Sequence, residues 1–426
     1  MTKEELKKII TENTEFILGL EREMIKRESL ELPEKIKKVV VLYGVRRSGK
    51  TSLLFANFLK APSRSLYVDF EDERLIGFSL SDFELLKDSF FELNPDLIGK
   101  KVSFSLDEVQ NVQGWERFAR RMVERENVDV FVAGSSSKLS PTEIHTSLRG
   151  REWTVEVLPF SFREFLIARG IKTSKKLKKY SRERIRIASL FEEYLRWGGF
   201  PEVVLAESNF EKKKILKDYL GAMFFKDIVE RFNLTNIPLL EALKERLFSS
   251  FASSFSVAGF YKKTKQLIPF SKDSVYTYYD CFLKSMLIYE VRKFSDSIYV
   301  QMRNPAKIYL VDTGLARRVT SEDTGRLLEN LVFLELKKRG YKLYYFANKR
   351  ECDFVAKRGD ELSTFQVTMT LTESNWEREV RGAASTARVL GLKEATIITL
   401  ERQEEIEEEG VHIRVIPCWK WMVEEK

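Results

Sequence analysis

The chain has 426 residues, too many for one ordinary hydrophobic core, so we expect two to four domains. Apolar residues make up 43% of it and charged residues 32%, and this Lys- and Glu-rich composition is typical of thermophile proteins. The net charge of +8 permits nucleic-acid binding, but an evenly charged surface explains it equally well. No stretch reaches the length of an apolar membrane span or resembles a signal peptide, so we expect a cytoplasmic protein.

Strand-like apolar runs alternate with amphipathic or loop segments through the first 160 residues. The predicted strands are Val39–Tyr43, Ser65–Phe70, Val102–Leu106, Val128–Ala133 and Thr154–Leu158. Several of these runs are apolar at nearly every position, as expected of strands covered on both faces. The alternation predicts an α/β fold with a parallel sheet and crossover helices.

The pattern changes after residue 160. Helix-periodic segments fill the region from Ser161 to Leu234, short helices and then strands follow from Ile237 to Phe294, and a second α/β unit begins at Asn304. We therefore expect four parts: an α/β core at residues 1–160, a helical lid at 161–235, a winged-helix-like segment at 236–303 and a C-terminal α/β domain at 304–426.

The middle segment reads as three helices followed by IYEVRKFSDSIYV, which predicts two short strands around a turn. Val275, Phe282 and Met286 give the third helix a buried stripe. Lys272, Tyr276 and Lys284 would then point outward, where a winged helix contacts DNA. Because winged helices also serve as packing or dimerisation modules, direct DNA contact stays one of two alternatives.

The C-terminal unit is expected to alternate helices and strands. Helices are predicted around 327–339 and 377–390, and strands at 342–346, 353–357, 364–368, 395–400 and 413–417. The acidic run ERQEEIEEEG is expected to form a solvated helix and turn.

The stretch after the first strand fits the phosphate-binding motif G-x-x-x-x-G-K-[ST]. Glycines let the backbone fold tightly so that its amides face phosphate oxygens, and the following helix adds its positive end. Lys50 can reach the β- and γ-phosphates, and the Thr51 hydroxyl can ligate Mg²⁺. The predicted nucleotide contacts are Gly44, Val45, Arg46, Arg47, Ser48, Gly49, Lys50, Thr51 and Ser52.

Other candidate catalytic residues follow later strands. Asp107 and Glu108 end an apolar strand, where the Asp would hold Mg²⁺ through water and the Glu would polarise the attacking water. Ser135 ends the fourth strand, where it would lie near the γ-phosphate, and Arg149 or Arg151 could stabilise charge on a neighbour's nucleotide. The plainer alternatives are a helix cap for the acids, a turn for the serine and a surface ion pair for the arginines.

Several stretches together resemble an archaeal and bacterial group of AAA-type P-loop ATPases that carry a C-terminal domain of unknown function. These stretches are GVRRSGKTSLL, SFSLDEVQ, AGSSSKL, SLRGREWTVEVLPFSFREFL, YLRWGGFPEVV, NPAKIYLVDTGLA, GRLLENLVFLELKKRG and ECDFV. The resemblance implies an additional-strand ATP-binding core, a helical lid, a winged-helix-like segment and a nuclease-like C-terminal fold.

The order of Glu329 on a helix, Asp353 opening a strand and Gln366 on the next strand resembles the PD-(D/E)xK nuclease fold. Nucleases of this kind need carboxylates for Mg²⁺ and a lysine to activate water. Here Gln366 stands in place of the second acid and Thr368 in place of the lysine, and a neutral amide is a poor Mg²⁺ ligand. We therefore expect a fold that is kept for binding, with its catalysis lost or weak.

The sequence thus favours an ATP-hydrolysing, Mg²⁺-dependent molecular switch that acts on or near DNA. ATP and ADP are the expected ligands, a homo-oligomer is possible, and DNA would bind the winged helix and basic clusters at 172–186 and 212–217. Two alternatives remain: an ATP-gated, metal-dependent DNA nuclease, and an ATP-regulated module that only binds DNA or protein.

Overall fold

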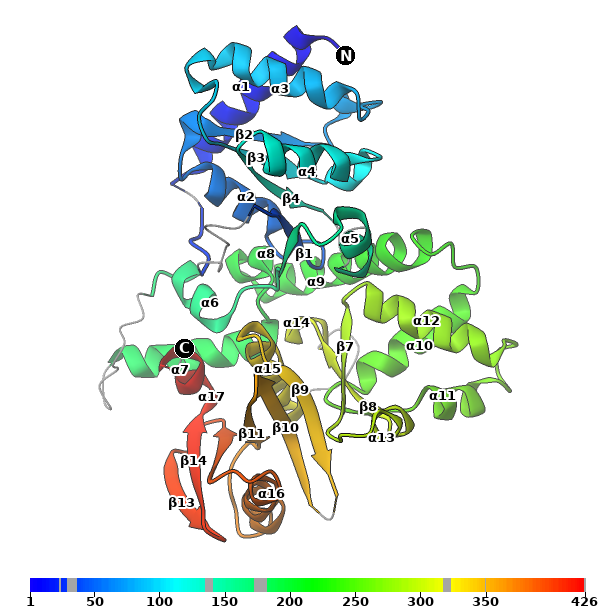
Figure 1. Ribbon diagram of the computed structural model, residues 1–426. Helices are drawn as coiled ribbons and strands as arrows, with labels where there is room; N and C mark the ends of the chain where they lie inside the picture. The colour runs from blue at the N-terminus through cyan, green and yellow to red at the C-terminus, as the bar shows by residue number, and fades with distance from the viewer. Residues whose placement is uncertain are drawn as a thin grey trace. The chain divides into compact units, whose positions relative to one another are not determined.

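The chain folds into two compact units, Met1–Leu158 and Pro159–Lys426 (Figure 1). The computed structural model describes residues 1–22, 24–28, 37–134, 141–171, 182–316, 323–348 and 350–424. Within this part of the chain, no helix is long and apolar enough to cross a membrane.

The first unit is built on a five-stranded sheet in the order β2-β3-β4-β1-β5. Every pairing in it is parallel, and β4 lies between β3 and β1. The strands are β1 (Val39–Tyr43), β2 (Ser65–Asp69), β3 (Val102–Asp107), β4 (Val128–Ala133) and β5 (Glu152–Glu156). The predicted parallel α/β sheet is therefore confirmed, including the extra strand between the first and the third.

Helices cover both faces of this sheet (Figure 1). They are α1 (Lys3–Leu20), α2 (Lys50–Phe58), α3 (Asp82–Leu93), α4 (Trp115–Arg125) and α5 (Pro141–Leu148). Along β1, Val39 and Val41 pack into the core beneath α3 and α4, whereas Val40 and Leu42 pack against α2. The strand is buried on both faces, which is why its sequence is apolar at consecutive positions.

The second unit contains a nine-stranded mixed sheet in the order β13-β14-β12-β11-β10-β9-β7-β8-β6. Three pairings are parallel, β11 with β12, β12 with β14, and β7 with β9. The strands are β6 (Ser253–Phe255), β7 (Ile288–Lys293), β8 (Ala306–Leu310), β9 (Lys342–Ala347), β10 (Glu351–Arg358), β11 (Glu361–Val367), β12 (Glu394–Thr399), β13 (Glu404–Glu408) and β14 (Val411–Pro417). Strands from both sides of residue 303, where we placed a domain boundary, belong to this one sheet.

The helices of the second unit come in two groups. Those up to β7 are α6 (Phe162–Ala168), α7 (Arg182–Trp197), α8 (Pro201–Leu205), α9 (Asn209–Phe224), α10 (Ile237–Ser249), α11 (Val257–Thr264) and α12 (Lys272–Lys284). Those after β7 are α13 (Ile298–Arg303), α14 (Thr313–Ala316), α15 (Thr324–Lys338), α16 (Trp376–Val389) and α17 (Cys418–Glu424). Val275 and Phe282 form the predicted buried stripe of α12, whereas Met286 is also buried but lies beyond the end of the helix.

Two expected elements differ in the structure. The stretch expected as a second strand after β7 is helix α13, in which Ile298 and Tyr299 are 64% and 76% exposed. The antiparallel partner of β7 is β8, whose Ile308 and Leu310 are fully buried. Burial of these apolar side chains stabilises β8 beside β7.

The acidic run near the C-terminus is also not a helix. It forms strand β13, an antiparallel edge strand beside β14. Ile406 packs against the core under α16, while the glutamates next to it, Glu405 and Glu407, face solvent. Charged side chains on an edge strand prevent it from pairing with other chains, so the charge that suggested a helix is compatible with a strand.

Candidate functional site

The loop between β1 and α2 is shaped by its two glycines. Gly44 has φ +148°, and a Cβ added to it would lie 2.3 Å from the Val157 carbonyl oxygen. Gly49 has φ +96° and caps the start of α2 in the left-handed region. Larger residues are therefore excluded at both positions, and the loop backbone lies directly against the strand-to-loop turn at Val157.

Polar groups of the loop face inward. The buried Lys50 ammonium donates to the carbonyl oxygens of Gly44 and Val45, both at 3.0 Å. The Ser48 hydroxyl is fully buried and makes no hydrogen bond within the described part of the chain. A buried cation and a buried hydroxyl in a tight glycine loop fit the phosphates of a nucleotide, which carry the charge and acceptors that such groups need.

The other predicted nucleotide contacts differ in exposure. Val45 is buried, Arg46 is half-buried, and Arg47, Thr51 and Ser52 are exposed. Arg47 also has φ +65°, a backbone conformation that non-glycine residues adopt only rarely.

Arg27, a residue that the sequence did not mark, holds the loop through hydrogen bonds to backbone carbonyl groups. The Arg27 guanidinium donates to the Ser48 carbonyl oxygen at 2.8 Å and to the Leu158 carbonyl oxygen at 2.9 Å. It thus ties the loop to the end of the unit, 131 residues away in sequence. No local pattern marks Arg27, because its role depends on two distant carbonyl groups.

The acids after β3 lie next to the loop. The Thr51 hydroxyl donates to the Asp107 carboxylate at 2.6 Å, and the Tyr67 hydroxyl donates to the same oxygen at 3.2 Å. Burial raises the pKa of Asp107 to about 6. The hydroxyl and carboxylate predicted as Mg²⁺ ligands are therefore adjacent, and a hard oxygen pair of this kind fits Mg²⁺. Tyr67 was not anticipated, since tyrosine is common in buried strands.

Glu108 lies one residue beyond the strand end in an unusual conformation. Its φ is +45°, in the left-handed region, and its side chain is half-buried. The Gln110 amide donates to the Glu108 carboxylate, and the Glu108 amide donates to Asp107 Oδ1 at 3.0 Å. Strained positions of this kind concentrate at functional sites, because neighbouring contacts must hold them.

The two candidate arginines lie at the opposite edge of the sheet from the loop. Val39, which begins β1, pairs in parallel with Glu152, and its amide donates to the Arg151 carbonyl oxygen at 2.8 Å. Strands of this length separate the two edges by roughly 15 Å. Arg151 pairs with Glu124 at 2.8 Å, and Arg149 is exposed. Neither arginine reaches the loop of its own chain, and Ser135 lies outside the described residues.

The predicted nuclease-like residues meet in the second unit. Lys307 of β8 places its ammonium 3.0 Å from Glu329 Oε1 and 2.8 Å from Asp353 Oδ1. The Tyr309 hydroxyl donates to Glu329 Oε1 at 2.7 Å. Glu329 lies on helix α15 and Asp353 on strand β10, the kinds of element on which the sequence placed them. Lys307 and Tyr309 were not marked, because β8 was not predicted as a strand.

Gln366 is engaged on the other side of this cluster. Its side-chain oxygen accepts from the Asp353 amide at 3.1 Å, and its amide donates to Glu379 of α16 at 2.6 Å. The Thr368 hydroxyl donates to the Thr370 carbonyl oxygen at 3.2 Å. Both residues stabilise local structure, and Glu379, which is fully buried, is a further residue that the sequence did not mark.

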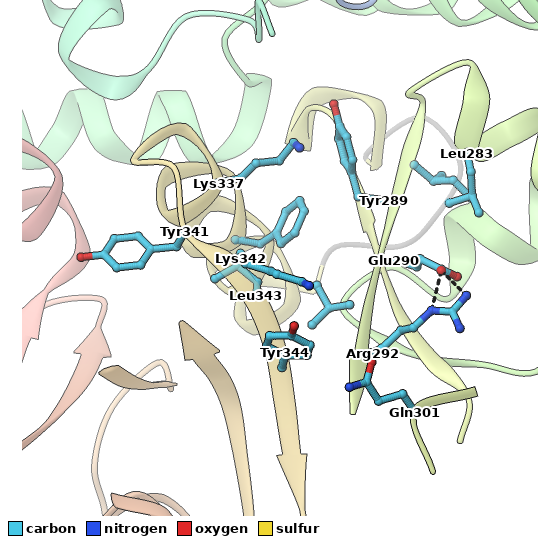
Figure 2. Close-up of a pocket in the computed structure, with 13 residues that line it drawn as sticks. Leu283, Tyr289, Glu290, Arg292, Gln301, Lys337, Tyr341, Lys342, Leu343 and Tyr344 are labelled. Atoms are coloured by element: carbon cyan, nitrogen blue, oxygen red, sulfur yellow. Dashed lines mark hydrogen bonds and ion pairs between the residues drawn. The ribbon is translucent and has the colours of Figure 1, made fainter. Parts of the chain in front are cut away.

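A groove of about 600 Å³ opens between β7 and β9 (Figure 2). These strands pair only at Arg292 with Tyr344 and at the next position, so they diverge towards the other end. Lys337 and Lys342 extend into the space between the strands, and the Lys337 ammonium lies 4.5 Å from the centre of the Tyr289 ring. The groove combines cations with aromatic rings.

Comparisons with known proteins match three regions of the chain. The family profile described as "AAA domain" matches residues 36–166. Two profiles described as domains of unknown function match residues 188–325 and 324–421.

Relatives match nearly the full length. An uncharacterized protein of Methanocaldococcus jannaschii is 34% identical over 405 residues, covering 92% of this chain and 88% of that protein. An uncharacterized protein of Haemophilus influenzae is 27% identical over 400 residues, covering 89% and 94%. Among solved structures, the Walker-type ATPase of Pyrococcus abyssi is 14% identical with a TM-score of 0.42, covering 73% of this chain and 95% of that one.

Proposed function

Because the chain belongs to the family of AAA-domain proteins that includes its Methanocaldococcus jannaschii relative, we propose that it is a Mg²⁺-dependent, ATP-hydrolysing molecular switch. The observation that carries this proposal is the contact between the Thr51 hydroxyl and Asp107, directly beside the buried Lys50. A loop that only capped a helix would not bring a cation, a hydroxyl and a buried carboxylate together.

Each residue then has a defined task. Backbone amides from Val45 to Lys50 and the Lys50 ammonium bind the phosphates. Thr51 and Asp107 would hold Mg²⁺, the Asp through water, and the bound ion would neutralise phosphate charge. Glu108 orients the attacking water towards the γ-phosphate and accepts a proton from this water.

An arginine from a second copy of the chain completes the proposed site. Arg149 and Arg151 lie at the far edge of the sheet from their own loop, so either can reach a nucleotide only across a subunit interface. Of the two, Arg149 is the better candidate, since Arg151 is paired with Glu124.

The test compares two lysine variants in steady-state ATP hydrolysis. Lys50→Ala should abolish nucleotide binding and turnover, because it removes the buried charge that meets the phosphates. Lys60→Ala removes an exposed lysine just beyond the same helix and should leave hydrolysis unchanged. Unchanged hydrolysis in Lys50→Ala would reject the proposal.

A second candidate function is action on DNA through the middle segment. The order from α10 to β8 is helix, strand, helix, helix, strand, short helix, strand, and β8 lies between β6 and β7. Three helices packed with a small antiparallel sheet support a winged-helix arrangement in which α13 lies between the last two strands. Lys272, Tyr276 and Lys284 are exposed on its third helix, as expected for DNA contact.

The groove beside this segment adds support for DNA binding. Lysines and tyrosines in one groove suit a nucleic-acid strand, whose phosphates need cations and whose bases stack on rings. Lys342 adds a cation beside the Tyr344 ring, and Arg292 in the same groove is paired with Glu290 (Figure 2).

Fluorescence anisotropy with labelled oligonucleotides would test DNA binding, with and without a non-hydrolysable ATP analogue. The DNA affinity should fall as salt rises and should weaken in Lys272→Ala and Lys337→Ala. Lys60→Ala, in the other unit, serves as the matched control. An affinity insensitive to salt and to both substitutions would rule out this binding mode.

A further inference from the structure

An ammonium group lies where two carboxylates converge in the C-terminal fold. Lys307 Nζ is 3.0 Å from Glu329 Oε1 and 2.8 Å from Asp353 Oδ1. The three residues come from three elements, β8, α15 and β10. The lysine thus links the last strand of the proposed winged-helix arrangement to the two elements that carry the nuclease-like acids.

The cluster is largely shielded from solvent. The side chains of Lys307, Glu329 and Asp353 are 18%, 13% and 16% exposed. Two carboxylates in such a place repel each other strongly unless a cation lies between them. The Lys307 ammonium provides that cation, and the Tyr309 hydroxyl and the Val367 amide complete the hydrogen bonds of the two carboxylates.

The residues around the cluster do not fit a divalent ion in addition to the lysine. Gln366 is bonded to Glu379 at 2.6 Å, and Thr368 is bonded to the Thr370 carbonyl oxygen. Among the described residues, no group of three or more His, Cys, Asp or Glu side chains is arranged to hold a metal ion. A metal-dependent nuclease reaction therefore has no cation to use at this place.

We propose that the Lys307 ammonium replaces a divalent cation between Glu329 and Asp353, so that the C-terminal fold is held together without metal and the two acids form a latent divalent-cation site. A neutral residue at position 307 leaves two adjacent carboxylates with no counter-charge. Mg²⁺ and Mn²⁺ are often bound through one or two carboxylates together with water, so a pair of carboxylates that has lost its counter-charge suits them.

Manganese binding to the nucleotide-free, full-length chain tests this inference, with free Mn²⁺ measured by electron paramagnetic resonance. Lys307→Met keeps the length of the side chain and removes its charge, and it should bind about one more Mn²⁺ per chain than the unmodified protein. The double variant Lys307→Met with Asp353→Asn should return to the unmodified stoichiometry, which separates this site from the phosphate loop.

Thermal unfolding provides the second readout. Lys307→Met should unfold at a lower temperature than the unmodified chain, and Mn²⁺ should raise that temperature, because an ion that binds only the folded state stabilises it. Lys307→Arg keeps the charge and should show neither effect.

Two outcomes would overturn the inference: a folded Lys307→Met that binds no additional Mn²⁺, or an unmodified chain whose Mn²⁺ binding is lost in Asp353→Asn. If Lys307→Met does not fold, the second comparison alone decides, and it uses only the unmodified chain and its Asp353→Asn variant.

Discussion

At the scale of single residues, close contacts restrict which residue types can occupy the positions of the nucleotide site. Gly44 faces the Val157 carbonyl oxygen too closely for any side chain, and Lys50 is buried against the loop backbone. Asp107 accepts hydrogen bonds from Thr51 and Tyr67 while burial raises the pKa of its carboxyl to about 6. The site is thus organised by close contacts before any nucleotide binds, which lowers the ordering cost of binding.

Glu108→Gln tests the proposed water-polarising acid. Turnover should fall by about 10²–10⁴-fold, because an amide cannot take the proton from water, while the side chain keeps nearly the same shape. Nucleotide affinity should stay close to that of the unmodified chain, as measured by calorimetry with ATP and Mg²⁺. A large loss of affinity would instead assign Glu108 a structural or binding role.

At the scale of elements, the parallel sheet separates the phosphate loop and the acids from the two candidate arginines. All five strands point the same way, so the loop and the acids after β3 lie at the carboxyl edge. The arginines precede β5 and lie at the amino edge. This polarity keeps both arginines away from the loop of their own chain, so in the proposed function they act on the nucleotide of a neighbouring subunit.

Arg149→Ala should lower ATP hydrolysis with little effect on nucleotide binding, because the arginine would act only on a neighbour's nucleotide. Mixing this variant with Lys50→Ala should restore part of the activity. In the mixed assembly, the intact loop of one subunit meets the intact arginine of the other.

Arg151→Ala is the matched control for this experiment, since Arg151 forms an exposed ion pair with Glu124 and its loss should change activity little. If the ATP hydrolysis of the mixture does not exceed the sum of the rates of the two variants measured alone, the arginine does not act between subunits.

At the scale of the whole second unit, one buried carboxylate joins two distant motifs. Asp312 follows β8, and its side chain accepts from the Gly199 amide at 2.7 Å and the Gly314 amide at 2.8 Å. A Cβ added to Gly198 would lie 1.7 Å from Asp312 Oδ1, so the absence of a side chain at Gly198 makes room for this contact. The helical segment before Pro201 and the turn after β8 are therefore fixed to each other.

Asp312 should make the stability of this unit depend on pH. Burial raises its pKa from 3.8 to about 7, so between these values the folded chain binds a proton that the unfolded chain releases. The contribution of Asp312 to the free energy of unfolding therefore falls as pH rises from about 4 to about 7.

Urea unfolding of the unmodified chain and of Asp312→Asn at several pH values would measure this contribution. The asparagine variant should show the flatter dependence of stability on pH. It keeps only one of the two side-chain oxygens that accept backbone amide hydrogen bonds, so its free energy of unfolding should be lower from the start. Parallel curves for the two proteins would show that Asp312 does not titrate in this range.

The sequence by itself determined the features that depend on neighbours in the chain. The glycine loop and the buried strands of the first unit were predicted correctly, because a tight turn and a two-sided strand each need particular residues in an unbroken run. Asp107 and Glu108 lie at the end of β3, as the sequence predicted. The strand order, with β4 between β3 and β1, agrees with the additional-strand core that the resemblance to AAA-type ATPases implied.

The tertiary structure alone decided the features that depend on distant partners. Pairing with β7 made Ala306–Leu310 a strand, while Ile298–Arg303 is a helix, and pairing with β14 made the acidic run an edge strand. Arg27 at the loop and Lys307 between two acids act through groups far away in sequence. Local patterns cannot reveal such residues, because their charge is satisfied only after the chain has folded.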